Sequence, residues 1–401
     1  MPANYPDAET RRLDAALLDW IDTVPAGFTS AGRTRAECYG LEQRAFDAME
    51  QRFETLALDL FAYQFERVEV YGAYARALGR TPNSVRRAHD VPALPVEALR
   101  RTRVAGFPQA AACAQFHTSG TTGAPGVLHL DSLALYDLAL SRGFAHHVIP
   151  DLDRMHILLL APAWQETPHS SLAYMLERVR QRWGTAASDS YVRGGRLRWP
   201  ELQRTLAHAV ASDEPVCILG TAFALVEMLE ACEQTGGSVC LPPGSRVFET
   251  GGMKGRRREL SRARLRHELE QHLGVPASHV VSEYGMTELA SQYYTLSLRL
   301  ALLGDANRAP AIADTTEWWS APMWLHPRIM DAETGACRRA ESPGDPGLLT
   351  HHDLGNRSSV AHFLCADLGA PRGASFELRG RCPRADLRGC GLVDEHRSAA
   401  N

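Results

Sequence analysis

Four short apolar runs in the middle of the chain, separated by amphipathic segments, most constrain its fold. The runs occupy residues 155–163, 216–223, 245–252 and 278–285. Helical periodicity is predicted at 131–145, 169–183, 200–212, 221–233 and 258–273. Short apolar strands that alternate with helices are typical of an α/β fold with largely parallel strands. Ligands in such sheets bind beyond the carboxyl ends of the strands, so the polar turns after these runs mark the expected site.

The segments on either side of these runs have different patterns. Residues 9–80 are predicted to be helical because apolar side chains recur at helical spacing. The proline-rich segment 81–100 is expected to be a connector. After about residue 320, short apolar stretches joined by turns predict a small β-rich subdomain. The expected division is a helical region with its connector (1–100), an α/β core (101–320), the β-rich subdomain (321–379) and a short tail (380–401).

Composition excludes several classes of protein. Hydrophobic residues make up 45 %, charged residues 22 %, and the net charge is −4, which is ordinary for a globular protein and argues against a mainly electrostatic nucleic-acid binder. No apolar run approaches the ~18–20 residues that span a bilayer, and the first residues do not form a secretory signal. The nine cysteines are scattered without a CxxC pair, so we expect a reducing cytoplasm and neither a disulfide framework nor a zinc site.

The segment HTSGTTG, residues 117–123, cannot pack a core. Its glycines let the backbone approach an anion closely, successive N–H groups can form an anion-binding nest, and its hydroxyls add donors. It lacks the lysine of the GxxxxGK[ST] phosphate loop, which disfavours that class of NTPase. The alternative is a polar surface loop.

A second polar segment, SEYGMTELASQYY, covers residues 282–294. Tyr284 could stack on a base, Thr287 could donate to a phosphate, and Glu288 could coordinate a hard cation such as Mg²⁺. The alternative is an ordinary helix start, capped by Thr287 or Ser282.

Together, TSGTTG and YGMTE resemble the adenylate-forming superfamily of acyl-CoA synthetases, luciferases and adenylation domains. Further stretches follow in the order of that superfamily: FETGG (248–252), CADLG (365–369) and GRCPRAD (380–386). The resemblance implies that the first loop holds the β- and γ-phosphates of ATP. It also implies that YGMTE stacks adenine and binds the α-phosphate and Mg²⁺, and that Asp367 and Arg381 lie at the ribose.

Four other stretches are similar to the acyl-protein synthetase family of bacterial bioluminescence: residues 168–176, 218–225, 249–262 and 387–396. This closer resemblance implies layered α/β sheets like those of the N-terminal domain of adenylate-forming enzymes, with 101–320 as the nucleotide-binding core. It implies activation of a fatty acid as acyl-adenylate, transfer to the enzyme's own cysteine, and delivery to a partner protein.

The resemblance also implies the site residues. The nucleotide would be bound by Thr118, Ser119, Gly120, Thr121, Thr122, Gly123, Glu249, Thr250, Gly251, Gly252, Tyr284, Gly285, Met286, Asp367 and Arg381. Catalysis would involve Cys390, Lys254, Glu288 and Thr287, with Glu288 as the metal ligand.

The chain departs from the superfamily pattern in its lysines. Gly126 stands where the phosphate loop usually continues with lysine, and a C-terminal domain bearing a catalytic lysine is expected to be absent or truncated. Lys254 is the single lysine in the chain. Arginine does not replace a compact lysine charge everywhere, so Lys254 is expected to neutralise a phosphate or the substrate carboxylate. The alternative is a chance surface position.

Cys390 is the candidate nucleophile. Arg384 and Arg388 lie nearby in sequence and would favour a thiolate, and the flanking glycines leave the backbone open. The alternative is an incidental cysteine.

The sequence therefore predicts an enzyme that uses ATP and Mg²⁺ to activate a carboxylic acid and pass the acyl group to Cys390 and an acceptor protein. Two alternatives remain. One is a ligase that loads coenzyme A, a carrier protein or an amine, and the other is a nucleotide-binding protein that has lost catalysis. No nucleic-acid partner and no membrane span are expected.

Overall fold

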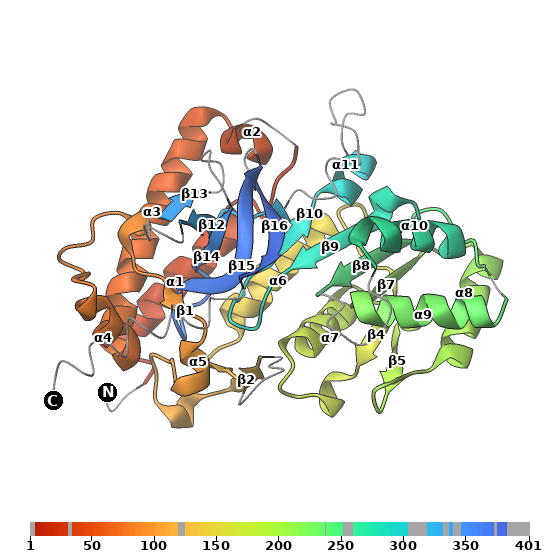
Figure 1. Cartoon of the computed structure of the whole chain (residues 1–401), viewed down its shortest axis with the longest axis horizontal. Helices are drawn as coiled ribbons and strands as arrows, with labels where there is room; N and C mark the ends of the chain where they lie inside the picture. Colours follow the sequence, from red (N-terminus) through yellow and green to blue (C-terminus); the bar gives the residue numbers. More distant parts are fainter. Residues whose placement is uncertain are drawn as a thin grey trace.

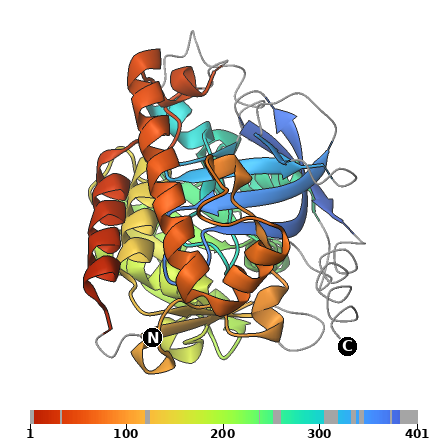
Figure 2. The ribbon, with the colours of Figure 1, turned by 90° about the vertical axis from the view of Figure 1, so that its left-hand side faces the viewer.

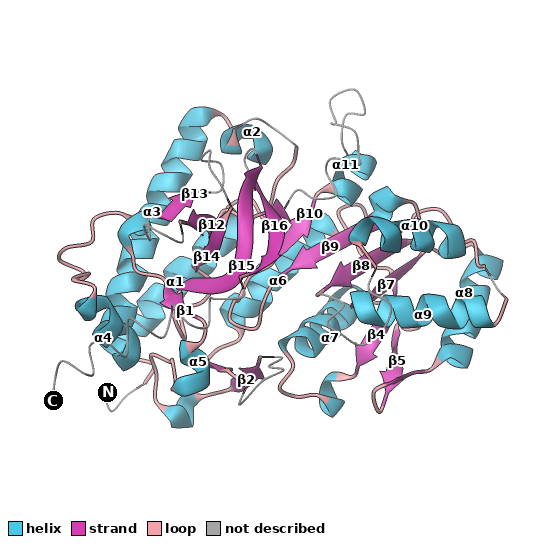
Figure 3. Cartoon of the chain, in the orientation of Figure 1, coloured by secondary structure: helices cyan, strands magenta, loops and turns pink. Residues whose placement is uncertain are grey.

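The computed structural model describes residues 5–30, 34–118, 125–236, 238–251, 260–303, 319–331, 337–339, 346–372 and 375–382. The chain forms two large sheets and one small one, with helices packed against the large sheets (Figures 1 and 3). In Figure 1 the N-terminal helices and the C-terminal strands lie together on the left, and the layers built from the middle of the chain lie on the right.

The larger sheet has eight strands in the order β11-β10-β9-β8-β7-β4-β5-β6. Five neighbours, from β9 through β5, run parallel, and the strands at both edges are antiparallel. The strands are β4 (His156–Pro162), β5 (Asp189–Arg193), β6 (Arg196–Leu197), β7 (Val216–Thr221), β8 (Arg246–Thr250), β9 (Val280–Tyr284), β10 (Tyr293–Thr295) and β11 (Trp319–Ser320). The four apolar runs are thus confirmed as β4, β7, β8 and β9.

Helices cover both faces of this sheet. Along β4, Ile157 and Leu159 belong to the core that contains α6 and α7, whereas Leu158 and Leu160 belong to the core that contains α8, α9 and α10. Because successive side chains of a strand point to opposite faces, a strand covered on both sides is apolar throughout. The five predicted helices are confirmed as α6 (Ala134–His147), α7 (Ser171–Trp183), α8 (Trp199–Ser212), α9 (Ala222–Gln234) and α10 (Arg262–Leu273).

The second sheet has the order β1-β15-β14-β12-β13, with β16 also paired to β15. Its strands are β1 (Leu94–Pro95), β12 (Leu325–Met330), β13 (Cys337–Arg339), β14 (Gly347–Asp353), β15 (His362–Arg372) and β16 (Ser375–Arg381), which confirms the strands predicted after residue 320. The connector differs from expectation because Leu94 and Pro95 pair in parallel with Phe363 and Leu364. A two-residue strand has no periodicity of its own and forms only because β15 offers partners.

The N-terminal helices pack on this second sheet. They are α1 (Ala8–Thr23), α2 (Arg35–Tyr39), α3 (Gln43–Arg67) and α4 (Glu69–Ala77), and Figure 2 shows α3 beside the C-terminal strands, with α1 next to α3 and α6. One apolar core contains Leu17 and Phe53 from the helices and Leu325 and Leu349 from the strands. The buried Gln64 amide adds polar contacts: Nε2 donates to Asn356 O at 2.8 Å, and Oε1 accepts from Ala361 N at 3.0 Å.

Short elements complete the chain. β2 (Ala114–His117) and β3 (Val127–Leu130) form an antiparallel pair. The remaining helices are α5 (Ala98–Arg101) and α11 (Ser297–Leu303), with 3₁₀ turns η1 (Ala88–Asp90), η2 (Gln109–Ala111), η3 (Trp164–Glu166) and η4 (Ala277–His279). Within the described residues, no helix combines the length and apolarity needed to cross a membrane.

Candidate functional site

Buried acids lie at the carboxyl ends of the adjacent strands β8 and β9. Glu249 and Glu283 are 3 % and 6 % exposed, and the register pairs Glu249 with Ser282 and Thr250 with Glu283. Ser282 Oγ donates to Glu249 Oε2 at 2.6 Å, and Thr250 Oγ1 donates to Glu283 Oε2. Burial, strengthened by the nearby Glu249 charge, raises the pKa of Glu283 to about 7 despite the threonine hydroxyl. Glu283 therefore retains its proton in the folded protein at pH values where an exposed glutamate is ionised.

We expect Glu283 to make stability fall as pH rises. Its folded-state pKa lies above the usual 4.5, so the folded state binds more protons than the unfolded state between about pH 4.5 and 7. The free energy of unfolding should decrease across this window by at most about 1.4 kcal/mol per pH unit from this group. Urea unfolding at a series of pH values measures the slope. Glu283→Gln should flatten it, whereas Glu42→Gln, a change on an exposed side chain, should not; equal slopes in all three proteins would contradict the assignment.

Tyr284 connects the two large sheets. Its hydroxyl donates to Asp367 Oδ2 on β15 at 2.9 Å, and its ring lies 5.8 Å from Trp319 and 6.0 Å from Phe376, measured between centroids. Arg381 on β16 donates from Nε to Asp367 Oδ1 at 3.0 Å. Three residues predicted for base and ribose contacts, far apart in sequence, thus lie together. Each carboxylate oxygen of Asp367 has a second lone pair, so both protein contacts leave acceptor capacity for a hydroxyl.

The turn after β9 contains Gly285, Met286, Thr287 and Glu288, and it is held by buried residues at and just after the end of β14. Asp353, fully buried, accepts from Ala290 N at 2.9 Å and Ser291 Oγ at 2.7 Å, as well as from Gly355 N. Asn356 Nδ2 donates to Glu288 O at 2.7 Å. These bonds fix the chain at Glu288 and directly after it, which positions that carboxylate.

Replacing Asp353 by alanine should destabilise the protein strongly. The change leaves donors from residues 290, 291 and 355 without their acceptor, and each unsatisfied buried group costs roughly 1–3 kcal/mol. We expect a loss of about 3–5 kcal/mol in the free energy of unfolding, measured with denaturant. Asp59→Ala, at an exposed position of α3, should change it by less than about 0.5 kcal/mol. A comparable, small effect of both changes would disprove the anchoring role.

Glu288 is a partly buried carboxylate without an ion pair among the described residues. Burial raises its pKa to about 7, and the nearby Arg100 and Arg381 guanidinium groups act in the opposite direction. A carboxylate that is desolvated but not paired is a favourable ligand for a hard cation.

The two ends of the first polar loop, Thr118 and Gly126, are hydrogen-bonded to each other and form what we call the neck of the loop. Thr118 N donates to Gly126 O at 2.9 Å, and Gly126 N donates to Thr118 Oγ1 at 2.9 Å. His117 N donates to His169 O at 2.8 Å, and Ser171 Oγ at the start of α7 lies 3.4 Å from Thr287 Oγ1. The neck of the loop and the turn after β9 therefore meet at the amino end of α7.

Several predicted site residues lie outside the described residues: Ser119, Gly120, Thr121, Thr122, Gly123, Gly252, Lys254 and Cys390. Gly251 is the last described residue before 252–259. It has a φ of 70°, a left-handed conformation that favours glycine. The chain can therefore turn sharply at Gly251, directly after the end of β8.

Cys365 lies beside this site, with its Sγ 3.9 Å from Tyr284 Oη. Its Sγ lies 3.5 Å from His351 Nε2, but it is buried and burial raises its pKa, so it remains a thiol. His351 accepts or donates at Nδ1 with Tyr293 Oη at 2.9 Å, while the ring of His352 stacks on His362. The adjacent histidines face opposite sides of β14, as expected for a strand.

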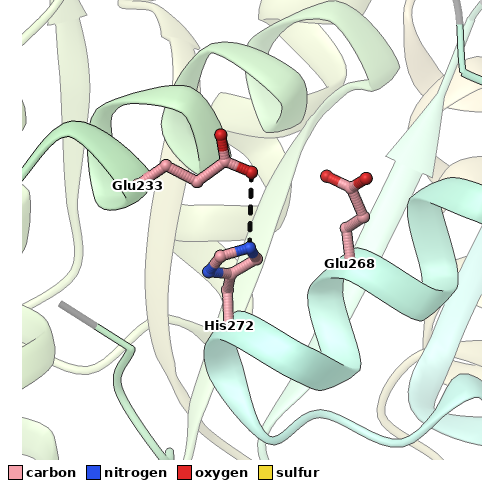
Figure 4. Close-up of side chains that lie close together, drawn as sticks. All are labelled: Glu233, Glu268 and His272. Carbon is pink, nitrogen blue, oxygen red and sulfur yellow. Dashed lines mark ion pairs between the residues drawn. The ribbon is translucent and has the colours of Figure 1, made fainter. Parts of the chain in front are cut away.

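A separate group of possible metal ligands lies away from this site. Glu233, Glu268 and His272 have ligand atoms within 4.8 Å of one another, and this is the one such group among the described residues (Figure 4). Glu233 and His272 lie near the carboxyl ends of α9 and α10, which in a β–α–β unit return toward the amino ends of the strands, and Glu268 lies one turn before His272. Arg264 Nε already donates to Glu268 Oε1 at 2.8 Å. This group therefore lies toward the amino ends of the strands, away from Thr250 and Glu283 at their carboxyl ends.

Sequence reasoning missed Glu283, Ser171 and Arg100 as members of this region. Glu283 precedes the recognised YGMTE motif, and only its burial distinguishes it. Ser171 lies within the stretch 168–176, which carries a family resemblance but no chemical signal of its own. Arg100 lay in a segment interpreted as a connector, and no sequence signal points to it.

Comparison with known proteins supports one family. The family model described as acyl-protein synthetase, LuxE, matches residues 42–397. A search of curated proteins returns no match.

Solved structures show the fold. A 2-hydroxyisobutyryl-CoA ligase in an open conformation aligns over 82 % of this chain and 75 % of its own, with 14 % identity and a TM-score of 0.55. A long-chain-fatty-acid–CoA ligase from Archaeoglobus fulgidus aligns over 71 % of this chain and 54 % of its own, with 13 % identity and a TM-score of 0.46. A fatty acid AMP ligase from Legionella pneumophila aligns over 67 % and 49 %, with 14 % identity and a TM-score of 0.41. The first likeness shows a mixed α/β fold of the kind found in adenylate-forming ligases.

The family match covers most of the chain. Membership in this family implies adenylate-forming activity, and with it ATP, an acid substrate and an acyl acceptor. The chain belongs to the LuxE acyl-protein synthetase family of adenylate-forming ligases.

Proposed function

We propose that this enzyme activates a fatty acid as acyl-adenylate, transfers the acyl group to its own Cys390, and delivers it to a partner protein. The observation that carries the nucleotide site is the convergence of Tyr284, Asp367 and Arg381 beside the turn that bears Glu288. A carboxylate oxygen of the acid attacks the α-phosphorus of ATP, and the bond to the β-phosphate breaks to release pyrophosphate. Catalysis consists chiefly of positioning and charge neutralisation.

The chain's residues divide this work. Tyr284 offers a ring for adenine, Asp367 accepts from ribose hydroxyls, and Arg381 holds Asp367 in place. Thr287 and the loop 118–123 donate to phosphate oxygens, and Lys254 neutralises a phosphate or the acid. Glu249 and Thr250 at the end of β8 contribute to the adenine site with Gly251 and Gly252, together with Gly285 and Met286 from the turn after β9.

Glu288 is the proposed Mg²⁺ ligand, and its surroundings fit this role because it is desolvated and has no cationic partner at ion-pair distance among the described residues. Bound magnesium supplies positive charge to the phosphate oxygens. The second step uses Cys390 as a thiolate, which attacks the acyl carbonyl while AMP leaves, so a thioester replaces the mixed anhydride.

Exchange of labelled pyrophosphate into ATP tests the first step. With a panel of carboxylic acids of different chain length, exchange should require one class of acid, and we expect long aliphatic acids to support it best. Exchange with none of the acids would refute adenylate formation and favour a protein that has lost catalysis. Product analysis with coenzyme A present tests the identity of the acyl acceptor. Formation of free acyl-CoA without labelled protein would show that coenzyme A, and not a protein, accepts the acyl group.

A further inference from the structure

Among the described residues, the proposed phosphate site has few positive charges. Gly126 stands where the superfamily pattern carries a lysine, and Arg381 is already paired with Asp367 at 3.0 Å. The β- and γ-phosphates of ATP carry most of its negative charge, so a site that binds them requires a cation besides Mg²⁺. An arginine that reaches this place without a competing carboxylate would meet that need.

Arg100 occupies such a place. It lies in the last turn of α5, which packs against β3 and lies beside β2 in Figure 1. A Cβ built at Gly126 would lie 3.4 Å from Arg100 Cγ and 3.3 Å from Thr118 Oγ1. The arginine stem therefore fills the space beside the neck of the loop, and the absence of a side chain at residue 126 admits it.

The charge of Arg100 is available and acts at the same site. The side chain is exposed, and within the described parts of the chain its guanidinium has no carboxylate at ion-pair distance. The group nevertheless lies close enough to Glu288 to act on its carboxylate electrostatically. The neck of the loop, the proposed metal ligand and an unpaired guanidinium thus lie in one neighbourhood.

We propose that the Arg100 guanidinium binds the β- or γ-phosphate of ATP and the departing pyrophosphate, replacing from α5 the cation that the loop lacks at Gly126. This inference rests on the proposed adenylate-forming function. An arginine presents paired N–H donors to phosphate oxygens, so the contact provides charge and orientation together. The contact involves only the β- and γ-phosphates. The contacts between the protein and the AMP part of the nucleotide stay unchanged.

Calorimetric binding of ATP, pyrophosphate and AMP to the full chain tests this assignment. Arg100→Ala should weaken binding of ATP and pyrophosphate about tenfold to a hundredfold, while AMP affinity changes by less than about threefold. Arg100→Lys should keep part of the affinity because it retains the charge. Arg44→Ala, on the exposed side of α3, is the matched control and should bind all three ligands like the wild type.

Three results would overturn the proposal. ATP affinity of Arg100→Ala equal to that of the wild type would exclude the contact. An equal loss of ATP and AMP affinity would indicate a structural effect. Weakened ATP binding in Lys254→Ala but not in Arg100→Ala would assign the role to Lys254. Failure of the wild type to bind either nucleotide would instead refute the proposed function itself, so the two failures are distinguishable.

Discussion

Replacing Cys390 by serine is expected to abolish covalent labelling of the enzyme by radioactive fatty acid and ATP. In the wild type, the thiolate takes the acyl group from acyl-adenylate, and the thioester survives denaturation but is cleaved by neutral hydroxylamine. A serine hydroxyl at the same position is a far weaker nucleophile without an activating base, so labelling should fall by at least about a hundredfold. Pyrophosphate exchange should remain near the wild-type rate because adenylate formation precedes the thiol step.

Cys382→Ser is the matched control, since Cys382 lies nearby in sequence and is partly exposed. It should be labelled like the wild type. Hydroxylamine-sensitive labelling retained in Cys390→Ser would move the nucleophile to another residue. Loss of both labelling and exchange in that variant would show a structural effect instead, which thermal unfolding would detect.

Replacing Glu288 by glutamine should reduce pyrophosphate exchange by about a thousandfold or more, which corresponds to the several kcal/mol of charge stabilisation that a bound metal ion supplies. The amide keeps the shape of the side chain and its backbone anchors through Asp353 and Asn356, but it removes the negative charge that holds Mg²⁺. Raising the Mg²⁺ concentration should recover part of the activity, because the defect is in metal affinity.

Glu66→Gln, at an exposed position of α3, provides the comparison and should leave exchange unchanged. Measurements over a range of Mg²⁺ concentrations separate two cases. A Glu288→Gln enzyme with wild-type exchange at low Mg²⁺ would exclude Glu288 as the ligand. A defect that Mg²⁺ never relieves would point to a role in positioning the turn rather than in binding the ion.

The extent to which the fold was predictable differs between elements. Strands β4, β7, β8 and β9 were predictable because helices cover both faces of the sheet, which requires a continuous apolar run. Strand β1 was not, because its two residues acquire extended pairing only from β15. The packing of α1 and α3 on the second sheet also escaped prediction, since amphipathic helices indicate a buried face but not its partner.

The candidate site was likewise predictable from the sequence only in part. Tyr284, Thr287, Glu288, Asp367 and Arg381 were predicted through resemblance to a family, because their types and order along the chain carry chemical information. Their mutual distances were not in the sequence. The bond from Tyr284 to Asp367 depends on how the two large sheets approach each other, and the anchoring of the Glu288 turn depends on Asp353 of the second sheet.

By itself, the sequence determined the α/β class, the order of the main helices and strands, and the family to which the chain belongs. Those properties depend on local periodicity and on short motifs, which are readable in one dimension. Only the tertiary structure placed Arg100 beside Gly126 and buried Glu283 against Thr250. Such neighbours arise from the packing of whole elements, and the physical cause is that burial and charge act through space rather than along the chain.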